Sequence, residues 1–203
     1  MLQESVAWFG QVLQATITVT PPIATPAAPT DAGAYTTSTS LTFNWQAVTD
    51  PYYSIAGYNC QIGTTPGGTD VYNAYVGNVL GKTVTGSKGK SYYCRVQAVD
   101  SASWTSPWSS SSDGIAVVEH AGLSISAAKQ LSQLASVGLS SKTLSAVFGD
   151  CFYIQESDRS SGIRVSAAEM PSGLVPGQLV DVGGVLMISP NGERYISGAV
   201  SVH

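Results

Sequence analysis

Apolar and polar residues alternate along most of this chain, and the alternation predicts short β-strands. The pattern is clearest at residues 41–45, 57–63 and 92–99, where every second side chain is apolar. Period-two alternation places the apolar side chains on one face of a strand. Turn signals separate these stretches, as in an all-β sandwich. Further strands are expected at 71–76, 81–85 and 104–118.

A second group of strands follows a change of pattern near residue 120. Residues 126–131 are a short helix candidate with a serine cap. Five strands in about 65 residues then suggest a small barrel. They are expected at 143–148, 151–156, 162–165, 178–188 and 193–202.

The N-terminal residues have a strand pattern of their own. Residues 15–20 alternate threonine with apolar residues, including Ile17 and Val19. A stretch rich in Pro, Ala and Thr follows, which is typical of a semi-extended linker. We therefore predict an arm and linker over 1–28. The arm is either an extra edge strand or tail of an upstream segment, or a strand that adds to another subunit's sheet.

Residues 29–119 resemble a fibronectin type III domain. The matching features are Pro29, Trp45, Gly57-Tyr58, Tyr92 opening Tyr-x-Cys-x-Val-x-Ala-Val, and Pro107-Trp108-Ser109 before Asp113-Gly114. The resemblance implies a core that contains Trp45 and Tyr58. It also makes Tyr92 the tyrosine-corner residue, which hydrogen-bonds the nearby backbone. Such domains serve as spacers, adhesion modules or accessory parts of enzymes, so the fold alone does not choose a function.

Residues 120–203 look like the OB-fold modules of bacterial extracellular proteins. The similarity lies in an aromatic strand at 152–156, a Gly-Ile-x-Val strand at 162–165, and a Pro-Gly turn that enters a long strand with a glycine pair. The pair, Gly183-Gly184, permits the sharp bend of a closing barrel. OB folds bind sugars, nucleic acids or other proteins. The expected fold is therefore all-β: a fibronectin type III-like sandwich followed by a small OB-like barrel.

Three cysteines leave one without a partner. The fibronectin type III resemblance puts the strands of Cys60 and Cys94 side by side, although family members usually have apolar residues there. We predict a Cys60–Cys94 disulfide, which would place the protein outside a reducing cytosol. The alternative is that both are small buried side chains in a reduced protein. Cys151 is expected in the barrel core.

Charge is scarce, and this narrows the classes of partner. Charged residues make up 11% of the chain, against about 25% in average domains. A weakly charged surface rich in hydroxyls suits an exported protein or one packed in an assembly. No Lys or Arg precedes Lys82, so the basic footprint that nucleic-acid binding needs is missing there. No apolar run is long enough for a transmembrane helix.

The first residues do not read as a secretory signal, because they lack a basic start and a long apolar core. Either a signal has been removed, or the sequence begins inside a longer precursor.

Residues suited to catalysis or metal binding are few. His120 lies in the interdomain linker and His203 is the last residue, so neither suits a catalytic triad or a zinc site. A predicted hairpin carries Asp150, Glu156 and Asp158. We interpret this acidic cluster as the solvent-exposed tip of the hairpin. We expect no enzyme activity, metal or cofactor.

Aromatic side chains near loops are the best candidates for binding, since they stack on sugars and anchor protein interfaces. In the first module these are Tyr52, Tyr53, Tyr75 and Trp104. On the barrel, the candidates are Tyr153, Arg164 and Tyr195. They would lie on one ligand-facing sheet if their side chains point to the same face of their strands.

The sequence favours a non-catalytic structural protein at the cell surface or outside the cell. We expect a subunit that associates with copies of itself into a filament, with its N-terminal arm on a neighbour, or one that associates with other surface proteins. A second hypothesis is a carbohydrate-binding accessory module of a secreted enzyme, with sugars on the aromatic rings. Single-strand nucleic-acid binding by the barrel ranks last, because residues 120–203 carry too few basic residues for a groove.

Overall fold

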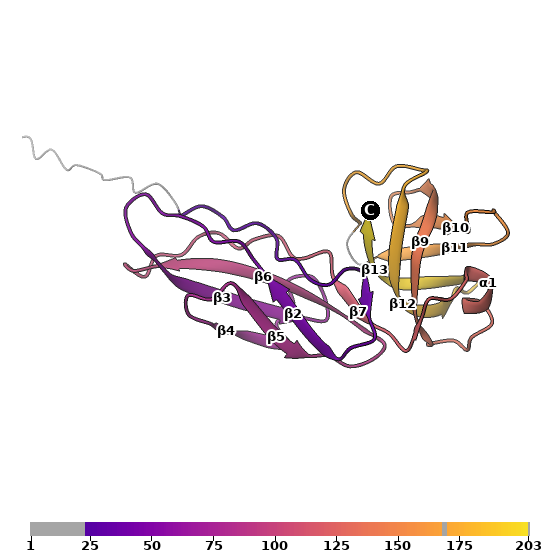
Figure 1. Ribbon diagram of the computed structural model, residues 1–203, viewed down its shortest axis with the longest axis horizontal. Coiled ribbons are helices and arrows are strands. Elements are labelled where there is room, and N and C mark those ends of the chain that lie inside the picture. The colour runs from indigo at the N-terminus through magenta and orange to yellow at the C-terminus, as the bar shows by residue number, and fades with distance from the viewer. Residues whose placement is uncertain (1–22, 168–169, 203) are drawn as a thin grey trace, which may run out of the picture.

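The computed structural model describes residues 23–167 and 170–202. Figure 1 shows an elongated sandwich formed by the N-terminal part of the chain, beside a more compact barrel formed by the C-terminal part. The all-β fold class predicted from the sequence is confirmed. The predicted arm, with Ile17 and Val19, lies outside the described residues.

The sandwich consists of a five-stranded sheet and a two-stranded sheet. The larger sheet has the order β1 (Tyr35–Thr36), β7 (Ile115–Val117), β6 (Lys90–Asp100), β3 (Ile55–Gly63) and β4 (Tyr72–Tyr75). The smaller sheet pairs β2 (Ser40–Asn44) with β5 (Gly81–Thr85). A bridge between Thr30 and Asn44 sets the segment before β1 alongside β2. This is the fibronectin type III-like sandwich that the sequence predicted.

Side chains from the alternating positions fill the space between the two sheets. Trp45 and Tyr58 are buried, and their rings meet edge to face with centroids 5.8 Å apart. The buried Tyr92 accepts a hydrogen bond at its hydroxyl from the Ser87 N–H, at 2.7 Å. This bond ties the turn before β6 to the core, as a tyrosine corner does. Ile23 packs in the same core, so the sandwich includes residues from position 23 onward.

Residues 104–113 differ from the regular strand that the sequence suggested. Ser109 donates its N–H to the Val96 carbonyl at 2.8 Å, and its hydroxyl accepts from the Val96 N–H at 3.0 Å. The same two bonds join Ser106 and Ser112 to alternate residues of β6. The segment advances three residues for every two of β6, with serine hydroxyls where a regular strand offers carbonyls. We call residues 105–113 the serine ladder.

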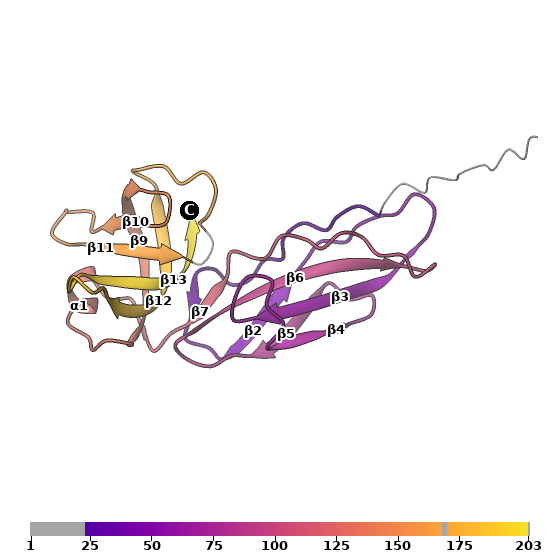
Figure 2. The same ribbon diagram turned by 180° about the vertical axis from the view of Figure 1, so that it is seen from behind.

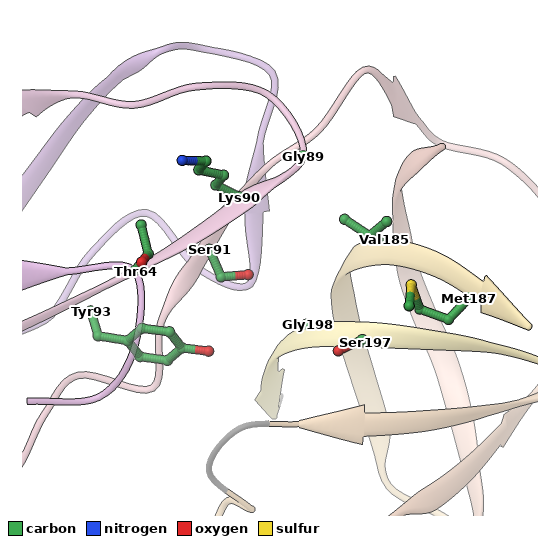
Figure 3. A pocket seen from close by; sticks show the side chains of 9 residues that line it. All are labelled: Thr64, Gly89, Lys90, Ser91, Tyr93, Val185, Met187, Ser197 and Gly198. Atoms are coloured by element: carbon green, nitrogen blue, oxygen red, sulfur yellow. The ribbon is translucent and has the colours of Figure 1, made fainter. Parts of the chain in front are cut away.

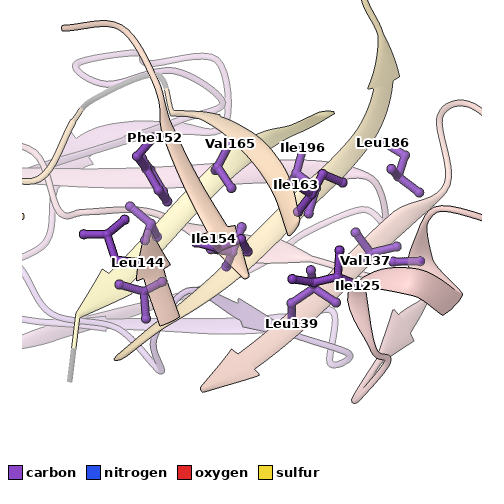
Figure 4. Close-up of a cluster of buried hydrophobic side chains, with 14 residues drawn as sticks. Ile125, Val137, Leu139, Leu144, Phe152, Ile154, Ile163, Val165, Leu186 and Ile196 are labelled. Atoms are coloured by element: carbon purple, nitrogen blue, oxygen red, sulfur yellow. The ribbon is translucent and has the colours of Figure 1, made fainter. Parts of the chain in front are cut away.

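The C-terminal part forms a closed barrel of five strands. They are β9 (Ser136–Val147), β10 (Phe152–Gln155), β11 (Gly162–Ala167), β12 (Leu179–Ile188) and β13 (Arg194–Val202). Because β9 pairs with both β10 and β12, the sheet closes on itself. Figure 4 shows the apolar interior, in which Leu139, Phe152 and Ile196 are fully buried. The predicted small barrel is confirmed.

Two local expectations were wrong in the barrel. The helix α1 (Ile125–Ala128) begins earlier than predicted, because Ser124, whose hydroxyl accepts from the Ala127 N–H, is the residue that caps it. β9 begins at Ser136, well before the predicted position 143. Its first half is rich in serine and glycine and has a weak alternating pattern, so pairing with β12 decides its extent.

The two modules lie side by side (Figure 2), and they join through a contact between a tyrosine and glycines. The Tyr35 ring, at β1, lies against Gly138 of β9, and the Cβ of the same residue lies against Gly183 of β12. A Cβ added at Gly183 would lie 2.3 Å from the Tyr35 Cβ and 2.5 Å from the Ala34 carbonyl oxygen. The connection is short as well: β8 (His120–Ala121) pairs with β9, and the Glu119 N–H donates to the Ser136 hydroxyl at 2.9 Å. The modules are therefore held as one unit.

We expect Gly183→Ala to destabilise the protein by about 1–3 kcal/mol, because backbone at the junction would have to shift. Thermal or denaturant unfolding measures the effect. Gly149→Ala is the matched control, since nothing lies within 4 Å of a Cβ added at Gly149. Equal stability of the two variants would contradict tight packing at the junction.

Candidate functional site

Exposed apolar side chains gather on three loops at one end of the sandwich. Tyr52 (60% exposed) and Tyr53 (43%) lie between β2 and β3, and Trp104 (63%) lies between β6 and β7. Val79 and Leu80, between β4 and β5, are exposed as well. We call these five residues the distal loop surface. The loops that carry Thr64 and Gly89 lie at the opposite end, next to the barrel (Figure 3).

Two aspartates fix the aromatic residues of the distal loop surface. Asp50 accepts hydrogen bonds at one carboxylate oxygen from the N–H groups of Tyr52 and Tyr53, at 2.7 and 3.0 Å. Asp100 does the same for the Trp104 N–H, at 2.8 Å. Such bonds fix the conformation of the loop backbone, and they do not involve the aromatic rings. The rings are thus presented to solvent by an ordered support.

A cavity of about 380 Å³ opens beside Tyr53. Its lining includes the polar residues Thr49, Asp50 and Asn78 together with Tyr53, beside apolar residues such as Val48. Aromatic faces beside hydrogen-bonding groups can receive a sugar or an anchoring side chain of another protein. Sequence reasoning found Tyr52, Tyr53 and Trp104, but it missed Val79 and Leu80, whose exposure depends on the turn between β4 and β5.

Tyr75 lies apart from this surface, on β4. Its hydroxyl donates to the Ala56 carbonyl at 2.8 Å, and its side chain is half exposed. It shares the outer face of the sheet with Asn59, Gln61 and Asn73. Gln61 donates to the Asn73 side chain at 3.1 Å, so this face is a hydrogen-bonded layer of amides.

The strand register brings the three candidate residues of the barrel together. Arg164 is directly opposite Tyr153 on one side and Tyr195 on the other. Its guanidinium lies 4.3 Å from the centre of the Tyr195 ring and pairs with Glu193 at 3.0 Å. The Tyr153 hydroxyl donates to Glu193 at 3.1 Å, and this bond raises the pKa of Tyr153. Tyr153, Arg164 and Tyr195 are thus held by contacts with one another and with Glu193.

A cleft of about 420 Å³ lies between the two modules. Figure 3 shows Lys90 and Tyr93 on the sandwich side, and Val185, Met187 and Ser197 on the barrel side. Lys90 is the one charged residue among the nine that line it, and the others offer hydroxyl, thioether, apolar or glycine surface. The lining has no carboxylate, imidazole or thiol side chain.

The predicted Cys60–Cys94 disulfide is wrong for this structure. The two side chains are buried neighbours on β3 and β6, but both are free thiols with sulfurs 3.8 Å apart. Cys60 is opposite Val96 and Cys94 is opposite Ile62, so the cysteines are diagonal. Diagonal positions are about 7–8 Å apart, wider than a disulfide accepts without backbone movement. The shared hydrogen bond lowers the pKa of Cys60 and raises that of Cys94. Cys151 is buried too.

Purified protein denatured without reductant should therefore show three reactive thiols per chain. A thiol-reactive chromophore measures the count, and prior reduction gives the reference value. Reduction should leave the number unchanged. A count of one before reduction and three after it would restore the bridge.

The acidic hairpin near residue 156 has a structural explanation. Burial opposes ionisation of Glu156, but hydrogen bonds from the Lys142 side chain at 2.8 Å and from the Ile125 N–H lower its pKa overall. Glu156 thus binds the start of α1.

Among the described residues, no three His, Cys, Asp or Glu side chains gather as a metal site would require. The described part of the chain also has no helix long and apolar enough to cross a membrane.

Asp31 is a site that sequence reasoning missed. One carboxylate oxygen accepts from the Gly33 N–H at 3.0 Å, and the other is buried without a hydrogen-bond partner. Burial raises the pKa of Asp31 to about 7, and the nearby Asp113 carboxylate adds to the rise. Nothing in the sequence signals this, because the burial depends on how the segment before β1 crosses between the sheets.

We expect stability to fall as the pH rises. The folded protein holds the Asp31 proton more tightly than the unfolded chain, whose carboxyl titrates near 3.8. The stabilisation is thus complete below about pH 4 and is lost as the pH passes through about 7. Asp31→Asn should raise stability at pH 8 by about 1–2 kcal/mol, after allowance for partial exposure. It should have little effect at pH 4. Unfolding curves at the two pH values check this, and equal effects would contradict it.

Comparison with known proteins gives similarity at the level of single modules. No protein-family model and no curated protein matches the chain. Among solved structures it is similar to the sixth fibronectin type III domain of human fibronectin type III domain containing protein 3. The identity is 21% over 45% of this chain and 82% of that chain, with a TM-score of 0.36.

A titin module from human cardiac muscle is similar as well, at 25% identity over 47% of this chain and 92% of that one, with a TM-score of 0.35. The FN1–FN3 domains of chicken CNTN1 match at 13% identity over 88% of this chain and 68% of that one, with a TM-score of 0.36. Strand order and buried residues carry the assignment of the sandwich.

Proposed function

We propose that this chain is a non-catalytic structural protein that acts outside the cell and assembles with copies of itself into a filament. The observation that carries the proposal is the junction. Tyr35 packs onto glycines of the barrel, so two modules act as one elongated unit (Figure 1). A rigid unit with apolar groups exposed on both modules suits a repeated contact between subunits.

The exposed apolar side chains support this proposal. One set is the distal loop surface. The other lies on the barrel, where the β9–β10 hairpin exposes Phe148 and the strand ends expose Leu179 and Val202. Backbone bonds between Leu144 and both Gly177 and Gln178 hold the segment before β12 against β9. The barrel set is therefore part of an ordered surface.

The weak charge of the chain supports an exported location and an assembled state. Only 11% of residues are charged. Surfaces with little charge tend to associate at high concentration, whereas charged ones stay dispersed. Serine, threonine and amide groups supply hydrogen bonds instead, as the layer around Gln61 does.

Carbohydrate binding is a second candidate function, favoured by Tyr53 and Trp104 on the distal loop surface and by the cavity beside Tyr53. A monomer that binds polysaccharide, and loses this binding with Tyr53→Ala, would favour this alternative. Nucleic-acid binding has less support, because Arg164 is engaged by Glu193 and Tyr195.

The N-terminal arm tests the self-assembly proposal. Ile17→Asp combined with Val19→Asp should weaken assembly by tenfold or more, since each ~1.4 kcal/mol lost from a contact is about tenfold in affinity. Sedimentation velocity of the full chain over a concentration series measures the shift, and electron microscopy identifies filaments.

Thr16→Asp combined with Thr18→Asp is the matched control, because it adds the same charge at the polar positions of the arm. This control should assemble better than the first variant. A wild-type chain that stays monomeric at every concentration would overturn the proposed function, and equal behaviour of the two variants would remove the arm from it.

A further inference from the structure

We infer that the free edge of β4 receives residues 15–20 of a neighbouring copy as an additional strand. This inference rests on the proposed self-assembly and identifies where the arm binds.

β4 pairs with β3 along one side only. Backbone groups alternate in direction along a strand. The Val76 N–H donates to the Tyr58 carbonyl of β3, so the groups of Ala74 point toward β3 as well. The N–H and C=O groups of Asn73 and Tyr75 then point away from the sheet. Among the described residues, no strand pairs with β4 on this side, so these backbone groups can pair with another chain.

Two other stretches of backbone at the sides of the larger sheet are covered. The serine ladder covers β6 on the side of β7, and β1 is packed against the barrel at Gly183. On β5, the inward side chain of Lys82 places its ammonium 4.0 Å from the centre of the Tyr72 ring of β4. β4 carries no charge, proline or bulge within its four residues.

The two faces of β4 match the pattern of the arm. Tyr72 and Ala74 are opposite the buried Ile62 and Cys60, so they lie on the inner face. Asn73 and Tyr75 lie on the outer face among amides. A strand beside β4 needs apolar residues on the inner face and polar residues on the outer face. Ile17 and Val19 supply the first, and the threonines between them supply the second.

The geometry favours a second copy over the same chain. Only Pro21 and Pro22 separate Thr20 from Ile23, so Thr20 lies within about 11 Å of Ile23. The Thr30–Asn44 bridge puts the segment that follows Ile23 beside the end of β2, on the side away from β5. Reaching the β4 edge from there crosses about three strand spacings, or ~14 Å. Addition to another copy places successive subunits head to side, a contact that repeats without closing.

Asn73→Pro tests this inference, because it removes an N–H that points away from β3. The β3–β4 pairing does not use this N–H, so its hydrogen bonds stay in place. Thr83→Pro is the matched control on β5, where the same alternation points the Thr83 N–H outward. In the full chain, Asn73→Pro should weaken assembly at least tenfold, while Thr83→Pro should leave it unchanged. Circular dichroism and thermal unfolding verify that both variants fold.

A cross-linking measurement covers the case in which a proline variant fails to fold. Full-length chain with Thr18→Cys is mixed under mild oxidation with chain that carries Asn73→Cys, and arm positions 16 and 20 are tried in turn. A disulfide dimer should form with Asn73→Cys and not with Thr83→Cys. If wild-type chain forms filaments but Asn73→Pro also does, or if the cross-link favours Thr83→Cys, the β4 edge is not the acceptor. If wild-type chain never assembles, the proposed function itself fails.

Discussion

The close approach of Tyr35 to the barrel is the contact on which the organisation of the molecule depends. Gly138 and Gly183 have no side chains, so an aromatic ring and a carbonyl oxygen of the sandwich can lie directly on the barrel backbone. The short connection through Glu119 and Ser136 adds a hydrogen bond at the same place. Two modules that would otherwise move independently thus become one body. The proposed assembly depends on this body, because a flexible pair would spread each contact over many orientations.

The same junction also determines which sheet edges stay open. It covers β1 and β7, while the serine ladder closes the side of β6 next to them. Among the described strands, β4 is a short edge without charged residues. A chain with such an edge and a strand-forming arm has the elements that a one-directional polymer needs.

Most of the fold could be predicted because alternation and turn residues are local signals. The strand at 81–85 and the burial of Trp45 and Tyr58 follow from such signals. What could not be predicted depends on contacts between distant residues. The first half of β9 is a strand because β12 lies beside it, and the cysteines stay unbridged because the register is diagonal. Exposure of Val79 and burial of Asp31 likewise depend on how segments cross in space.

The serine ladder has a consequence for how this sequence can change. Only every third residue between 105 and 113 bonds to β6, through a hydroxyl and its own N–H. The two residues between successive serines make no such pair of bonds, so substitutions there leave the hydrogen bonds of the ladder in place. A substitution of Ser109 by alanine would leave the Val96 N–H buried without an acceptor. Variation along this segment is therefore expected to follow a period of three, unlike the period of two in every strand around it.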